Sequence, residues 1–210
     1  MSLIKQDVNK FSTLSLVYQL ALIIFVLGVD SNQVQLTAVP IFLVIYSGFL
    51  APIFEEIVYR GSGKNLVRGH GKLLTMVISA ILFAMIHYHI PTLLATFFVG
   101  IVACYITMEY SLAWAILLHF INNFIYGGIV DNLINNLDPS LAGPVEWSIL
   151  LLIAVVTFTI IVMNRQKIRT YLIANQSPRS AYKEAFTAPM FIVAVMYSLV
   201  MIGLQGIFIK

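Results

Sequence analysis

The chain has 210 residues, of which 60% are hydrophobic and only 10% charged, and its mean hydropathy is +0.94. Soluble domains carry about 25% charged residues, so this composition excludes a soluble protein and predicts one integral membrane domain, an all-α bundle over residues 1–210. The net charge of +3 does not indicate a nucleic-acid partner, because the basic residues do not cluster into an aromatic-interleaved surface. The lipid bilayer is the partner that the composition indicates.

About seven apolar runs follow one another along the chain, each close to the ~20 residues that a spanning helix needs. They lie near residues 11–29, 38–60, 72–88, 92–108, 111–129, 147–163 and 187–208. The N-terminal lysines and the apolar run after them resemble a signal peptide. No small-residue cleavage pattern follows, so we expect a retained first helix.

Basic residues concentrate in alternate connections between these runs. They are Lys5, Lys10, Lys64, Arg68, Lys72, Arg165, Lys167, Arg169, Arg179 and Lys183. The positive-inside rule therefore predicts a multi-pass protein with its N-terminus in the cytoplasm. The longest polar connection, residues 164–186, is predicted to be a cytoplasmic loop attracted to anionic headgroups or, alternatively, a partner-docking segment.

The second apolar run contains three ionisable residues, Glu55, Glu56 and Arg60. Such groups are costly at membrane depth and mark functional sites. Glu56 and Arg60 are spaced i, i+4 in the favourable order for a helical ion pair. Glu55 is rotated about 100° away, unpaired on its own helix and desolvated, a setting suited to a general base. Pro52 is expected to break the helix and start its second piece.

Two later runs repeat the i, i+4 spacing, with Phe83 and His87 in one, and His119 and Asn123 in the other. Residues four apart share a helix face. At ~1.5 Å per residue, Glu55 and Asn123 lie roughly 20 Å from the cytoplasmic helix ends, His87 about 24 Å and His119 about 14 Å. These depths allow the groups to converge on one site.

Each polar group also has a purely structural interpretation. His87 and His119 can be packed, hydrogen-bonded interhelical contacts, and Glu56 with Arg60 can be a structural ion pair. Four glycines are expected to allow close approach of helices: Gly48, Gly100, Gly127 and Gly128.

The motifs Glu55-Glu56-x-x-x-Arg60, Phe83-x-x-x-His87 and His119-x-x-x-Asn123, in this order on successive membrane helices, resemble those of the CPBP (CAAX protease and bacteriocin-processing, or Abi) family of intramembrane proteases. The resemblance covers about residues 40–130. It implies hydrolysis of a peptide bond in or at the membrane. Glu55 and His87 would activate water, Glu56 and Arg60 would hold the helix, and His119 and Asn123 would face the oxyanion.

The resemblance leaves the cofactor open between none and Zn²⁺. Glu55, His87 and His119 would be a sufficient set of zinc ligands, but they lie on three helices without the compact H-E-x-x-H spacing. A metal-free, glutamate-activated water is the favoured interpretation.

The implied substrate is a small membrane-associated or amphipathic peptide, processed in bacteriocin-type maturation, self-immunity or CAAX-like trimming. The expected location is a bacterial plasma membrane. Two alternatives stay open: a non-catalytic immunity or regulatory partner protein, and a proton-coupled transporter. Against the transporter, the two halves contain no inverted repeat. The sequence does not predict the oligomeric state.

Overall fold

The computed structural model describes the chain except for residues 29–44, 64–67, 89, 131–132, 135 and 209–210. The described residues contain helices and no strand, which confirms the predicted all-α membrane bundle. The elements are α1 (Leu3–Gly28), η1 (Tyr46–Leu50), α3 (Ala51–Glu56), η2 (Ile57–Ser62), η3 (Arg68–His70), α5 (Lys72–Met85), α6 (Ile90–Glu109), α7 (Leu112–Ile121), η4 (Asn122–Val130), α9 (Pro139–Met163), α10 (Arg165–Ala174), α11 (Arg179–Phe186) and α12 (Pro189–Phe208).

Each predicted apolar run coincides with helical structure over most of its described residues, and the non-helical exceptions, residues 86–88, 111 and 187–188, lie at the ends of runs. By length and composition, two helical stretches of the described chain are long and apolar enough to cross a membrane, Leu112–Val130 and Pro139–Met163. The pair Arg179–Phe186 and Pro189–Leu204, bent by 60°, would be a third. Residues 38–44 of the second run lie outside the described residues. The total of seven spans and the cytoplasmic N-terminus stay predictions.

Pro52 changes the type of helix and does not interrupt it. Leu50 and Ala51 keep right-handed helical backbone angles, and the π-helical turn η1 passes directly into α3, with Pro52 in the first turn. The predicted break at Pro52 is therefore wrong: the helix continues through it, and because proline has no amide hydrogen the helix lacks one backbone hydrogen bond at this point. A second π-helical turn, η2, carries Arg60. Short π-helical segments often occur at functional sites.

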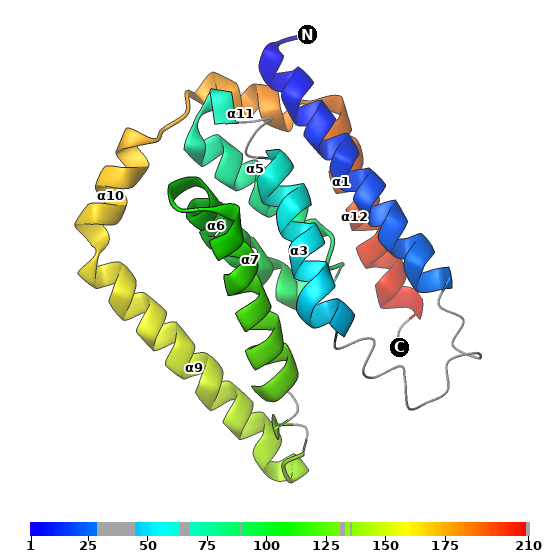
Figure 1. Cartoon of the computed structure of the whole chain (residues 1–210), viewed down its shortest axis with the longest axis vertical. Coiled ribbons are helices and arrows are strands. Elements are labelled where there is room, and N and C mark those ends of the chain that lie inside the picture. The colour runs from blue at the N-terminus through cyan, green and yellow to red at the C-terminus, as the bar shows by residue number, and fades with distance from the viewer. Residues whose placement is uncertain (29–44, 64–67, 89, 131–132, 135, 209–210) are drawn as a thin grey trace.

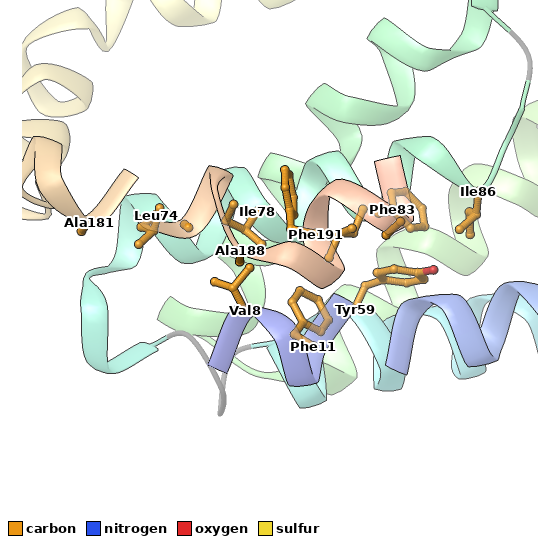
Figure 2. Close-up of a cluster of buried hydrophobic side chains, with 13 residues drawn as sticks. Val8, Phe11, Tyr59, Leu74, Ile78, Phe83, Ile86, Ala181, Ala188 and Phe191 are labelled. Carbon is orange, nitrogen blue, oxygen red and sulfur yellow. The ribbon is translucent and has the colours of Figure 1, made fainter. Parts of the chain in front are cut away.

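The core lies where α1, η2, α5, α11 and α12 meet (Figure 2). Figure 1 shows α1 and α12 side by side; α1 packs on η2, and α12 packs on α5. The cluster of buried side chains is Val8, Phe11, Tyr59, Leu74, Ile78, Leu82, Phe83, Ile86, Ala181, Ala185, Ala188, Phe191 and Ala194. Because Tyr59 and Phe83 belong to this core, the helices that carry the polar motifs are held against the most tightly buried part of the molecule.

Residues 164–186, predicted to be a loop, instead form α10 and α11. The prediction of a loop is wrong because a segment of polar composition can still be helical when one narrow face of it is apolar. In α11, Ala181 and Ala185 are spaced i, i+4 and both buried, so a short stripe docks this polar helix on the core. In the described chain α9 buries none of its residues, and Figure 1 shows it apart from the other helices.

Candidate active site

Glu56 and Arg60 form a fully buried ion pair. The distance between Glu56 Oε1 and Arg60 Nη1 is 3.0 Å, and both side chains are 0% exposed. The guanidinium carbon also lies 3.9 Å from the centre of the Phe83 ring, a cation–π contact from α5. Burying two charges is costly unless their partners are well placed. The pair therefore needs the further contacts that the neighbouring helices provide.

His119 provides one of these contacts and links the two glutamates. Its Nδ1–H donates to Glu56 Oε1 at 2.9 Å, and its Nε2 lies 3.7 Å from Glu55 Oε2. His119 is 6% exposed and Glu55 12% exposed. The same imidazole therefore stabilises the buried ion pair and faces the more accessible carboxylate. Because Nδ1 is committed to Glu56, only Nε2 is available to a reacting group.

Helix α7 delivers His119 to this position. The helix begins after Ser111, whose side-chain oxygen accepts a hydrogen bond from the backbone N–H of Trp114 at 3.4 Å. This N-cap satisfies one of the otherwise unpaired amides of the first turn. Helix α7 packs on α3 and η2, which places His119 beside Glu55 and Glu56.

Phe83 connects His87 to this cluster. Its ring makes edge-on contacts with His87, at 5.1 Å between ring centres, and with His119, at 5.7 Å. The Nδ1–H of His87 donates to the Phe83 carbonyl oxygen at 3.2 Å. A carbonyl oxygen can only accept a hydrogen bond, so this contact assigns the proton to Nδ1 and leaves Nε2 as the basic nitrogen. His87 itself is exposed.

Asn123 has fewer described contacts with the other predicted site residues than Glu55, His87 and His119 have. It is half-buried, and its Oδ1 accepts a hydrogen bond from Asn122 at 3.3 Å. Asn122 begins the π-helical segment η4. A π-helix has more residues per turn than an α-helix, so residues four apart no longer lie strictly on one face. The expectation that His119 and Asn123 share a helix face therefore holds less well here. The role of Asn123 stays a prediction.

The structure does not assemble the predicted set of metal ligands. No three His, Cys, Asp or Glu side chains in the described parts of the chain gather so as to hold a metal ion. Both nitrogens of His119 face carboxylates, and Nδ1 of His87 faces a backbone carbonyl. Glu55, His87 and His119 therefore do not fit a shared Zn²⁺ in this arrangement, and metal dependence stays open to experiment.

Several residues that support the cluster were not identified from the sequence. Tyr59 packs edge-on against Phe83 at 5.6 Å between ring centres, and its carbonyl accepts a hydrogen bond from Ser79 at 2.7 Å. Ser15 and Gln19 of α1 reach the same region. The only signal for them was a polar residue within an apolar run. Their contacts span up to 179 positions in the chain, and local spacing carries no information on such pairs.

The motifs lie in a part of the chain that matches a known family. Residues 37–125 match the family described as Rce1-like, type II CAAX prenyl endopeptidase Rce1-like. This region contains every predicted site residue from Glu55 to Asn123. No curated protein and no solved structure matches the chain. The match over residues 37–125 confirms the resemblance of this part of the chain to CPBP-family intramembrane proteases.

Proposed function

We propose that this protein is an intramembrane endopeptidase that uses Glu55 and His87 to activate water. One observation carries the proposal. Glu55 lies partly accessible at 12% exposure, beside a buried Glu56 whose charge Arg60 and His119 already compensate. A protein that needed only an ion pair between helices would not need the second carboxylate. The family match supports protease chemistry at this site.

In the proposed reaction Glu55 takes a proton from water as the oxygen attacks the carbonyl carbon of the scissile peptide bond. His87, with its proton on Nδ1, offers Nε2 to the same water. Collapse of the tetrahedral intermediate breaks the C–N bond, and the proton held by Glu55 passes to the departing nitrogen. His119 and Asn123 would donate hydrogen bonds to the oxyanion, Asn123 through its amide and His119 through Nε2 when that nitrogen carries a proton.

The proposed substrate is a small membrane-associated or amphipathic peptide in a bacterial plasma membrane. This substrate class covers bacteriocin-type maturation, self-immunity and CAAX-like processing. The support is the apolar character of the helices around the site together with the family match. A bilayer-embedded site of this kind reaches peptides that enter the membrane more readily than those that stay in water.

The test compares small membrane-associated peptides, by mass spectrometry, in cells with the wild-type protein, Glu55→Gln, His87→Ala or Glu146→Gln. Glu146 is an exposed glutamate on α9 and serves as the matched control. Glu55→Gln is expected to lower cleavage by about 100-fold or more, because a general base contributes on the order of 10²–10⁴-fold. Unaltered cleavage in both Glu55→Gln and His87→Ala would contradict the proposal and favour a non-catalytic immunity or regulatory partner.

A second experiment addresses metal dependence. We expect activity of the purified protein to survive exhaustive chelation and not to rise with added Zn²⁺, because the described histidines and glutamates do not form a three-ligand set. Loss of activity on chelation, restored by Zn²⁺ alone, would contradict the metal-free mechanism.

A further inference from the structure

Tyr88, the residue directly after His87, has an unusual backbone conformation. Its φ is 48°, and it is the only described residue other than glycine with a positive φ. Bulky side chains rarely adopt this left-handed region. Such conformations persist where the surroundings hold them, and they gather at functional sites. The left-handed conformation of Tyr88 therefore requires stabilising contacts from the surrounding structure.

Side-chain hydrogen bonds from the terminal helices hold Tyr88. The Tyr88 hydroxyl donates to Gln19 Oε1 of α1 at 2.8 Å. Gln19 is itself 1% exposed and fixed by two serines: its Nε2 donates to Ser15 Oγ at 3.2 Å, and Ser198 of α12 donates to its Oε1 at 3.4 Å. Gln19 is thus a buried amide whose bonds define a single orientation, which makes it a firm anchor for Tyr88.

The same face of α1 also contacts the other half of the candidate site. Ser15 and Gln19 are spaced i, i+4, so both lie on one face of α1. The Ser15 hydroxyl is 3.1 Å from the Tyr59 hydroxyl. Tyr59 directly precedes Arg60 and packs against Phe83. This face of α1 therefore touches the immediate chain neighbours of two motif residues, Arg60 and His87.

We propose that Gln19 is a positioning residue of the active site, which sets the place of the His87 imidazole by anchoring Tyr88. This inference rests on the proposed function, since it gives Gln19 a role through His87. It also assigns part of the site to α1 and α12, which lie outside the matched residues 37–125.

The geometry explains why His87 needs an anchor beyond its own helix. His87 follows Ile86, the C-cap of α5, so no further helical turn restrains it. Its imidazole donates to the Phe83 carbonyl at 3.2 Å, and its backbone N–H donates to the Ala84 carbonyl at 3.1 Å. If Tyr88 relaxed out of the left-handed region, the backbone at His87 would turn with it. A displacement of about 1 Å in a catalytic group can cost on the order of 10²-fold in rate.

The experiment measures peptide cleavage by the full chain in lipid vesicles for Tyr88→Phe, Gln19→Leu, Gln19→Glu and the double variant Tyr88→Phe/Gln19→Leu. Tyr88→Phe keeps the ring and removes only the donor. Gln19→Glu keeps an acceptor oxygen. Ser12→Ala is the control, because Ser12 is buried on the same helix and its hydroxyl has no hydrogen-bond partner in the described structure. The melting temperature of each variant is measured in parallel.

We expect Tyr88→Phe and Gln19→Leu each to lower kcat about 10-fold with KM changed less than about 2-fold, since a positioning defect acts on the transition state. The double variant should be no worse than Gln19→Leu alone, because that variant already lacks the Tyr88–Gln19 hydrogen bond. Gln19→Glu should keep kcat within about 3-fold of the wild type. Ser12→Ala should leave kcat unchanged.

Two results would overturn the inference alone: unchanged kcat in Tyr88→Phe while His87→Ala abolishes cleavage, or losses that follow the melting temperature in all variants including Ser12→Ala. A third result, equal cleavage by the wild type and His87→Ala, would instead overturn the proposed function, and the inference with it.

Discussion

Glu55 and Glu56 are neighbours in the chain but have different surroundings in the fold. About 100° of helical rotation separates them, so Glu56 faces Arg60 and the core while Glu55 faces His119 from the more accessible side. The i, i+4 spacing of Glu56 and Arg60 predicted their ion pair. It did not predict that His119 would bond to Glu56, because that contact joins residues 63 positions apart.

The two glutamates are expected to differ when each is replaced. Glu56→Ala leaves the Arg60 guanidinium buried and without its counter-ion, so we expect a loss of about 3–5 kcal/mol in the free energy of unfolding and poor accumulation in the membrane. Glu55→Gln removes only the base and should change the stability by less than about 1 kcal/mol.

Chemical unfolding in detergent micelles, followed by the loss of helical circular dichroism, measures both values. The double variant Glu56→Ala/Arg60→Leu is the control and should recover part of the loss, because it removes the unpaired charge. If Glu55→Gln were as unstable as Glu56→Ala, the separation into a catalytic and a structural carboxylate would be wrong.

At the scale of the elements, one close approach between helices positions Phe83. Gly100 of α6 faces α5 so closely that an added Cβ would lie 3.0 Å from Ala80 Cα and 3.3 Å from Phe83 Cδ1. The prediction that Gly100 allows close helix approach is confirmed. The same prediction for Gly48 is wrong within the described part of the chain, because an added Cβ there would meet none of its atoms within 4 Å. Composition alone does not distinguish a glycine at a helix contact from one on an open face.

We expect Gly100→Val to push α6 away from α5, to lower the free energy of unfolding by about 1–3 kcal/mol through overpacking, and to lower cleavage by shifting Phe83. Gly48→Val is the matched control, since it adds the same side chain to open space. Thermal unfolding and cleavage rates of the two variants give the comparison. Equal effects at both glycines would show that the contact at Gly100 has no special role.

At the scale of the whole molecule, a polar cluster attaches α10 to the helices that carry the site. Lys72 Nζ of α5 lies 2.7 Å from Glu109 Oε1 of α6, and the Tyr171 hydroxyl of α10 donates to the same oxygen at 2.8 Å. Partial burial and then the bond to Glu109 raise the pKa of Tyr171, so the phenol stays protonated and donates at neutral pH. In the described chain α9 buries none of its residues. This polar cluster and the docking of α11 therefore connect α9 and α10 to the bundle.

Removal of the Tyr171 hydroxyl should loosen this attachment. We expect Tyr171→Phe to increase amide hydrogen exchange in residues 165–174 by about 5-fold, the equivalent of one hydrogen bond of about 1 kcal/mol. Mass spectrometry of the protein in lipid nanodiscs measures the exchange. Tyr182→Phe in α11 is the control and should leave those residues unchanged. Identical exchange in both variants would mean that the Tyr171–Glu109 bond does not restrain α10.

The sequence by itself determined the membrane character, the helical class, the positions of the apolar runs and the motif residues, because hydrophobicity and i, i+4 spacing are local properties that a helix expresses directly. It also supported the family resemblance, which the match over residues 37–125 confirms. A single domain over residues 1–210 and the cytoplasmic N-terminus stay predictions.

Only the tertiary structure decided which partners those residues have. It placed His119 between Glu55 and Glu56, stacked Phe83 on Arg60, folded residues 164–186 into two helices, and brought Gln19 to Tyr88. Each of these outcomes depends on which helix faces meet across long separations in the chain. Packing of the whole bundle selects those faces, and no local pattern contains that information.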